Sequence, residues 1–215
     1  MTYLNLMNSV LRRLREEETT SVTSTTYVKM VGDFINDAKT LVGQAADWSA
    51  LRETLIITTA ASDNTYSLTG GSDNIKVMSM LNDTHNSFME YQTKDWFNEA
   101  LYIGNASEGT PQYYTYNGLD ANGDTQILVG PTPDGVYTIR VDTVKRQVDL
   151  SADADTLLIP SQPVIHLAVA LLARERGETG GTSTAEYFTI ANQYLSDAIA
   201  IDAAKHPEEM VFRTI

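Results

Sequence analysis

The chain has 215 residues, of which 42% are hydrophobic and none is cysteine, and it carries 28 acidic against 15 basic residues. This length and apolar content allow a folded core, while the absence of cysteine excludes disulfides, thiol nucleophiles and thiolate-bound metals. The formal net charge of −13 disfavours binding to phosphate, which depends on cations that displace counterions. We therefore do not expect a protein that reads a nucleic-acid sequence.

The sequence predicts neither a membrane span nor a signal peptide. No run approaches the roughly 18 consecutive apolar residues that a spanning helix needs. At the N-terminus the apolar positions precede the charged ones, which is the reverse of a signal peptide. We expect no membrane partner.

Two amphipathic helices are predicted in residues 1–50. Apolar side chains recur at helical spacing over residues 3–14 and again over residues 27–42. The Thr/Ser-rich run at 19–26 separates the two helices and supplies hydroxyls that can cap the second one, which should end near Asp47. These residues form an N-terminal helical pair.

A β-rich middle is predicted over residues 51–159, because short runs rich in β-branched residues alternate there with turn formers. In the run at 136–144, Tyr137, Ile139 and Val141 alternate with polar residues, which is typical of a sheet with one buried face. The main runs are 55–60, 64–68, 74–81, 126–130 and 136–144.

Two shorter features lie inside this middle. Residues 131–135 (PTPDG) predict a tight hairpin turn with Gly135 at positive φ. The run TKDWFNEALY at 93–102 predicts a short helix.

Two more helices are predicted over residues 160–206. The first is apolar on nearly all sides, stops at Gly177 and should be the most buried helix. The second starts at a capping box of Ser183 and Glu186. Its apolar stripe consists of Tyr187, Ile190, Tyr194, Ala198 and Ile201.

We interpret the fold class as α+β. The two helical pairs should complete a four-helix bundle, with the middle as a central antiparallel β-rich insertion. Residues 207–215 follow the helix breaker Pro207 as a C-terminal tail.

No catalytic or metal-binding pattern stands out, so we expect a protein without enzymatic activity, cofactor or metal. The histidines His85, His166 and His206 have no spacing that converges on a metal. Residues 120–124 partly match a calcium loop, but Asn-Gly between two strands is typical of a hairpin turn. Three successive glutamates at 16–18 diverge around a helix and are better interpreted as a solvated helix end than as the carboxylates of a wall-degrading enzyme.

An aromatic cluster gives an alternative contact surface. Trp96, Tyr113, Tyr114 and Tyr116, beside Phe97, suit either a glycan-stacking platform or a surface for a protein partner. Packing within a sheet is the competing interpretation, since tyrosine favours strands.

Four segments carry a resemblance to a known family: GTPQYYTYNG (109–118), QILVGPTPDGVYTIRVDTVKR (126–146), LSADADTLLIP (150–160) and VIHLAVALLARERGE (164–178). With the order helix–helix–β–helix–helix, they resemble the head-to-tail adaptors of tailed bacteriophages. This family of head completion or neck proteins includes the tail tubular protein A type of short-tailed phages. The resemblance covers most of the chain.

The resemblance implies a structural virion protein of the neck, assembled in the host cytoplasm. It implies a ring, commonly of twelve copies, between the portal protein and the next neck or tail protein. Packaged DNA would pass through the centre without sequence-specific binding. No catalytic residue carries over.

Within this reading, the tail is a candidate contact segment. Met210, Val211, Phe212 and Ile215 are too few to form a core of their own, so we hypothesise that they order on the portal or on a neighbouring subunit by adding a strand. The alternative function is a phage tail binding module that recognises a host glycan or another tail protein through the aromatic cluster.

Overall fold

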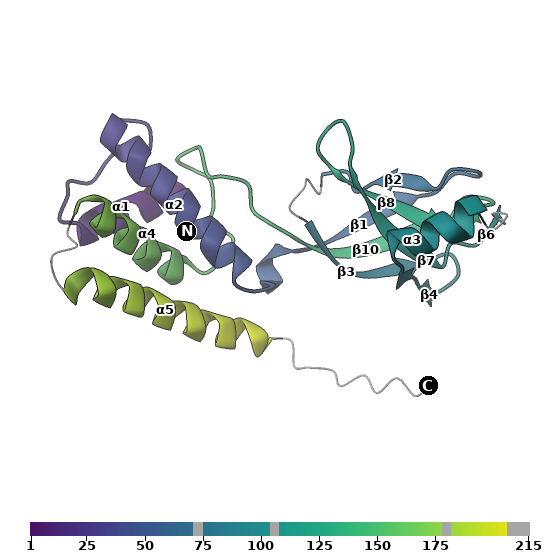
Figure 1. Cartoon of the computed structure of the whole chain (residues 1–215). Coiled ribbons are helices and arrows are strands. Elements are labelled where there is room, and N and C mark those ends of the chain that lie inside the picture. Colours follow the sequence, from purple (N-terminus) through teal and green to yellow (C-terminus); the bar gives the residue numbers. More distant parts are fainter. Residues whose placement is uncertain (71–74, 104–107, 178–181, 206–215) are drawn as a thin grey trace. The chain divides into compact units, whose positions relative to one another are not determined.

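The computed structural model describes residues 1–70, 75–103, 108–177 and 182–205 (Figure 1). The chain divides into two compact units, Met1–Leu51 with Arg146–Ile215 and Arg52–Lys145. In the described residues the first, the helical unit, contains four α-helices, and the second, the strand unit, contains the named strands and one short helix.

Helix α4 is the centre of the helical unit. The four helices are α1 (Tyr3–Arg13), α2 (Thr26–Gln44), α4 (Ser161–Glu175) and α5 (Thr182–Ala203). Helix α4 contacts each of the other three, whereas α5 packs mainly on α4. Nine of its fifteen residues are buried, more than in any other helix among the described residues, which confirms the prediction made from its apolar sequence.

Hydroxyl caps fix where the first two helices begin. The Thr2 side chain accepts a hydrogen bond from the Asn5 N–H, and Thr25 accepts one from the Val28 N–H. Thr25 belongs to the Thr/Ser-rich run, so the predicted cap of the second helix is confirmed. Helix α4 starts differently, because its N-cap is Pro160, which makes no side-chain capping bond.

Residues 146–160, here called the strap, return the chain from the strand unit to α4 along α1 and α2. Its backbone is tied to the start of α1 by the Tyr3 N–H, which donates to the Asp155 carbonyl at 2.7 Å. Its other anchor is Lys39 of α2, whose side chain is only 2% exposed. The Lys39 ammonium donates to the carbonyls of Gln147 and Val148 and to the Asp149 carboxylate, at 3.2, 2.8 and 2.8 Å. A buried cation is tolerated because every one of its donors has an acceptor.

The far end of α5 is tied down by one carboxylate. Asp202 accepts hydrogen bonds from the Ser49 N–H and hydroxyl at 2.8 and 2.6 Å, and it pairs with Lys205 at 2.9 Å. Partial burial alone would raise the pKa of Asp202, but the Ser49 hydrogen bonds and the Lys205 charge outweigh it and lower the pKa from 3.8 to about 2.

The strand unit contains two four-stranded sheets and one pair of short strands. The first sheet has the order β1 (Arg52–Thr58), β10 (Thr138–Lys145), β3 (Ile75–Asn82), β4 (Ser87–Phe88). The second has the order β2 (Thr65–Ser67), β8 (Thr125–Gly130), β7 (Tyr113–Leu119), β5 (Glu90–Tyr91). The pair is β6 (Glu108–Gly109) with β9 (Thr132–Pro133).

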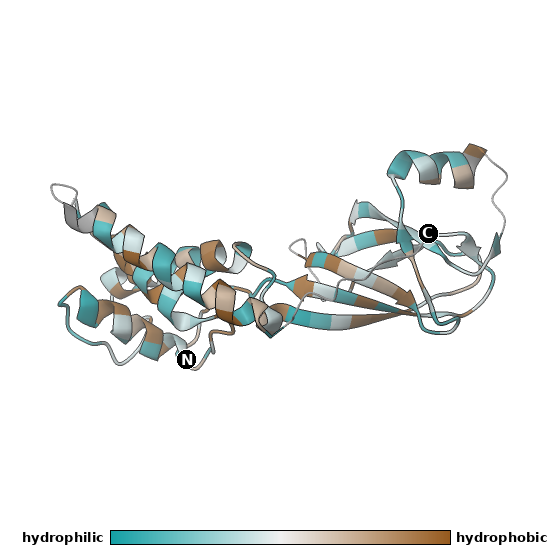
Figure 2. Cartoon of the chain, turned by 90° about the horizontal axis from the view of Figure 1, so that it is seen from below, coloured by the Kyte–Doolittle hydropathy of each residue, from teal (hydrophilic) through white to brown (hydrophobic). Residues whose placement is uncertain are grey.

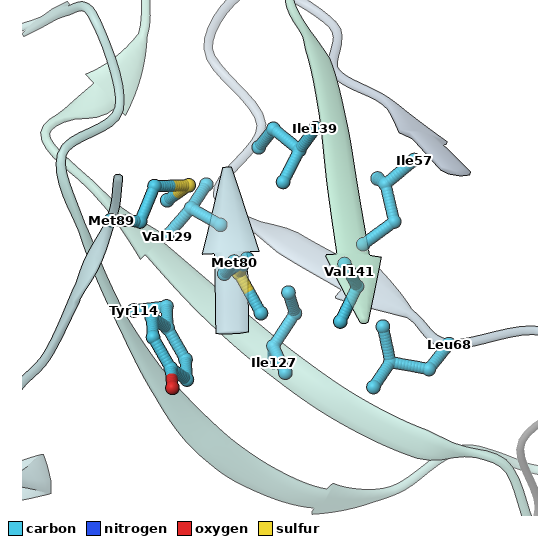
Figure 3. Close-up of a cluster of buried hydrophobic side chains, with 9 residues drawn as sticks. All are labelled: Ile57, Leu68, Met80, Met89, Tyr114, Ile127, Val129, Ile139 and Val141. Carbon is cyan, nitrogen blue, oxygen red and sulfur yellow. The ribbon is translucent and has the colours of Figure 1, made fainter. Parts of the chain in front are cut away.

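The two sheets enclose one hydrophobic core (Figure 3). Its buried members are Ile57, Leu68, Met80, Met89, Tyr114, Ile127, Val129, Ile139 and Val141. Hydrophobic and hydrophilic residues alternate along the long strands (Figure 2). The predicted inward residues are buried: Ile139 and Val141 lie in β10, and Tyr137 directly precedes it. The register of β10 shifts at a bulge between Asp142 and Thr143.

The predicted four-helix bundle with a central antiparallel insertion is wrong, although the chain is α+β. The short helix predicted at residues 93–102 is confirmed: it is a fifth α-helix among the described residues, α3 (Lys94–Asn98), which continues into the π-helical turn η2 (Glu99–Ile103). The sheets are not all antiparallel, because β5 runs parallel to β7 and β6 runs parallel to β9. Two-residue strands such as these carry no periodic signal, and hydrophobic spacing reveals an element without revealing its partner.

The hairpin predicted at residues 131–135 is also wrong. Strands β8 and β10 belong to different sheets, so the segment crosses between sheets instead of reversing within one. Gly135 does not adopt the positive φ that was expected of it. Strand β10 instead starts against β1, because the Thr59 N–H donates to the Tyr137 carbonyl and the Tyr137 N–H donates to the Thr59 hydroxyl. The hairpin turn at Asn122-Gly123, by contrast, joins β7 to β8 with Gly123 at φ +84°.

Replacing Lys39 by Met should lower the free energy of unfolding by about 2–3 kcal/mol, because two carbonyls of the strap lose their donor. Urea denaturation at neutral pH measures the change. The control is Lys29→Met on the exposed side of α2, which should stay within about 0.5 kcal/mol of the wild type. A Lys39→Met chain as stable as the control would show that the strap does not depend on this contact.

Stability should depend on Asp202 only where its carboxylate is ionised. Since its folded pKa lies below the ordinary value, its contribution is complete above about pH 4 and disappears as the pH falls toward 2. Asp202→Asn should lower the free energy of unfolding by about 1–2 kcal/mol at pH 7 and by clearly less at pH 3. Urea titrations at both pH values test this, with Asp197→Asn, an exposed position on the same helix, as the control. A pH-independent difference would contradict it.

Candidate interaction surfaces

Helix α5 leaves three large apolar side chains exposed among the described residues of the helical unit. Of the stripe predicted from the sequence, Ile190 is 39%, Tyr194 41% and Ile201 66% exposed. We call these three side chains the α5 apolar face. At 100° per residue they lie within roughly 40° of one another around the helix axis, so they form a single surface.

A different side of α5 packs on α4. Ala191 is buried, Phe188 lies under the Arg174 guanidinium of α4 at 5.9 Å, and Leu195 is half-buried. Tyr194 lies at the border, where its ring stacks on the His166 ring of α4 at 4.5 Å. Helix α5 is therefore apolar over more of its circumference than α4 covers, which explains why much of the predicted apolar stripe is exposed.

The predicted aromatic surface divides into two groups. Trp96, which is 37% exposed, contacts Tyr113 at 4.8 Å between ring centroids. Tyr114 faces the hydrophobic core instead and is 8% exposed. Tyr116 is 40% exposed and lies with Tyr114 and Tyr91. Because neighbouring residues of β7 point to opposite sides, Tyr113 and Tyr114 do not share a face.

The histidines and glutamates considered for chemistry have ordinary surroundings. The His85 ring lies 5.5 Å from the Tyr137 ring. The pKa of His166 is lowered, mainly by burial and to a smaller extent by the positive charge of Arg13. Glu16 pairs with Arg176 at 2.8 Å, and Glu18 pairs with Arg12 at 2.6 Å. His206 lies outside the described residues. Over the ranges that the structure describes, no group of three or more His, Cys, Asp or Glu residues suits a metal ion.

The four tail residues of the portal or neighbour hypothesis, Met210, Val211, Phe212 and Ile215, lie outside the described residues. Their contacts therefore remain a proposal.

Sequence reasoning did not single out a second surface, the free edge of β1. Beside it lies a hollow of about 270 Å³, lined by residues 55–58 of the first sheet and 66–69 of the second. On the outer face of the first sheet, Asp142 accepts hydrogen bonds from Thr54 and Ser79 at 2.7 and 2.9 Å, in a further hollow of about 360 Å³. The only sequence signal was the uncharged, β-branched run at 54–59, which predicts a strand but not its place at an edge.

Comparison with known proteins identifies the family of the chain. No helix within the described ranges is long and apolar enough to cross a membrane. None of the curated proteins compared with the chain matches it. The family model described as SU10 adaptor protein matches residues 1–210 and so covers nearly all of the 215 residues. The chain therefore belongs to the SU10 adaptor protein family and is a phage adaptor-type protein.

Proposed function

We propose that the chain is a head-to-tail adaptor, a structural virion protein that forms a ring between the portal protein and the next neck or tail protein. The ring consists of about twelve copies, as the family resemblance implies, and packaged DNA passes through its lumen. Family membership supports the adaptor role, which is architectural and not enzymatic. The observation that carries the ring is the α5 apolar face.

A closed ring needs two different surfaces on each subunit, because every copy meets one neighbour with one surface and the next neighbour with another. Helix α5 supplies one of them. Its Ile201 is 66% exposed, and the helix carries few charges. An exposed apolar face of this kind is typical of a protein–protein contact. The second surface lies elsewhere on the same chain, and in the ring it meets the α5 apolar face of the adjacent copy.

The net charge of −13 per chain agrees with a channel for DNA. Acidic groups that face the lumen repel the phosphate backbone, so that DNA passes without being held. The proposal needs no base-reading contact.

The tail carries the contact to the portal or to a neighbouring subunit in this proposal. Met210, Val211, Phe212 and Ile215 are its apolar residues. The proposed partners are therefore the portal protein, the next neck or tail protein, and further copies of this chain.

One observation favours the alternative, a binding module that recognises a host glycan or another tail protein. The exposed Trp96 lies against Tyr113, and such a pair suits stacking on a sugar ring. Tyr114 is part of the core, so a platform of all four aromatic residues is not available. Binding of the isolated chain to a glycan array, lost in Trp96→Ala, would favour this alternative.

Native mass spectrometry of the chain, alone and mixed with the portal ring of the same particle, tests the ring. We expect a discrete multi-copy assembly, either alone or with the portal. Ile201→Asp should reduce the assembled fraction at least tenfold, because a carboxylate would be buried without a partner in the subunit contact.

The matched control is Ser196→Asp, which adds the same charge to an exposed position of α5, roughly 140° around the helix from Ile201. It should assemble like the wild type, and both variants should keep the wild-type melting temperature within a few degrees. A chain that stays monomeric with the portal present would contradict the proposed function.

A further inference from the structure

Strand β1 is the one long strand at an edge position in the two four-stranded sheets of the described residues. It has seven residues and pairs only with β10. The other three edge strands are β4, β2 and β5, with two, three and two residues. Short edges offer few backbone groups for pairing with another chain, whereas a seven-residue edge offers a full row.

The register shows which backbone groups of β1 are free for pairing. The Thr59 N–H donates to the Tyr137 carbonyl, so the odd-numbered residues of β1 face β10. Hydrogen-bonded and non-bonded pairs alternate in an antiparallel ladder, which directs the N–H and C=O groups of Thr54, Ile56 and Thr58 to the open edge. The Asp83 N–H donates to the Thr138 carbonyl, which confirms the same alternation on the other side of β10.

Strand β1 begins with the exposed charged residues Arg52 and Glu53, but the run after them lacks the usual protections of an edge. From Thr54 to Thr59 it contains no charged residue, no proline and no glycine. Ile56 is 66% exposed on the outer face, while Leu55 and Ile57 point to the core side. Ile57 and Leu68, which border the hollow beside the edge, lie at the same side of the hydrophobic core (Figure 3).

We propose that this edge binds residues 209–215 of a second copy of the chain as an additional antiparallel strand. The inference rests on the proposed function, since a ring brings the tail of one copy next to another copy at high local concentration.

The sequence of the tail fits the two faces of β1. With Phe212 placed beside Leu55, the seven residues 209–215 lie opposite the seven residues Arg52–Thr58. Phe212 then joins Met210 on the core side, where Leu55 and Ile57 line the hollow of about 270 Å³. On the outer face, Val211 lies beside Ile56.

The charge of the tail fits the same register. Arg213 falls opposite Thr54, whose hydroxyl donates to the Asp142 carboxylate at 2.7 Å. The hollow of about 360 Å³ at this carboxylate leaves room for a guanidinium group. In this register apolar residues of the tail meet apolar residues of the edge, and Arg213 meets a carboxylate, while Glu209 falls opposite the neutral Thr58. This match is why a second copy is the chosen occupant.

Disulfide trapping tests the pairing between two chains. The sequence contains no cysteine, so introduced thiols react only with each other. A chain with Ile56→Cys that lacks residues 207–215 is mixed with a full-length Val211→Cys chain. In the proposed register these two positions are opposite each other, and opposed residues of a sheet lie within the range of Cα separations that a disulfide spans. We expect a covalent dimer on a non-reducing gel.

The control for trapping is Phe88→Cys in place of Ile56→Cys, because Phe88 is 68% exposed on β4 at the opposite edge of the same sheet. It should give no dimer above background. Equal trapping at Phe88 and Ile56 would overturn the proposal. So would a full-length Ile56→Cys, Val211→Cys double variant that closes its disulfide only within one chain.

A labelled peptide of residues 206–215 tests the backbone pairing. It should bind saturably to the chain that lacks residues 207–215, and methylation of its Val211 nitrogen should weaken binding at least about tenfold through the loss of a ladder hydrogen bond. The peptide with Arg213→Ala should bind the chain with Asp142 more weakly than the unchanged peptide does. The two peptides should bind the Asp142→Asn chain equally. Binding that ignores N-methylation would overturn strand addition.

The two proposals fail separately. A portal-dependent ring that forms while the peptide does not bind leaves the adaptor function intact and rejects the edge contact. Peptide binding with trapping at Ile56, but without any ring, supports the edge contact and rejects the proposed function.

Discussion

The constraint on which the other features depend is that the described residues of the helical unit leave large apolar side chains of α5 exposed. Helix α4 is already the shared core of the helical unit and meets α5 on one side only, through Phe188 and Ala191. The α5 apolar face remains open next to it. Burial of an apolar side chain is worth about 1.5–3 kcal/mol, so this face contributes favourable free energy only when another surface covers it.

The same principle applies to β1 in the strand unit. Backbone groups at an open edge form hydrogen bonds with water, and they exchange the water for a protein partner when a strand is added. Each unit therefore presents one incomplete element, a helix face in one and a strand edge in the other. In the helical unit, Lys39 and Asp202 hold the strap and the end of α5 through satisfied polar contacts.

Much of this fold follows from local patterns in the sequence. Helical spacing located α1 and α2, a hydroxyl cap was predicted for α2, and alternation identified the buried side of β10. Long-range pairing did not follow, because the crossing at 131–135 looks like a hairpin turn when read alone. The place of α5 illustrates the same limit. Its sequence is apolar on two sides, and periodicity cannot tell which of them α4 will cover.

The surfaces for contact were harder to predict than the elements. Four aromatic residues close in sequence suggested one platform, but alternation along β7 separates Tyr113 from Tyr114. The edge of β1 carries no polar motif, and only its position in the sheet makes it a surface. Such features depend on which strands are neighbours, and that is a property of the whole fold.

Electron cryomicroscopy of the neck in the intact particle tests the proposed ring. We expect a closed ring of this chain between the portal and the next tail component, with the α5 apolar face buried against the adjacent copy. A ring in which Ile190 and Ile201 remain in solvent, or a location of the chain away from the neck, would contradict it.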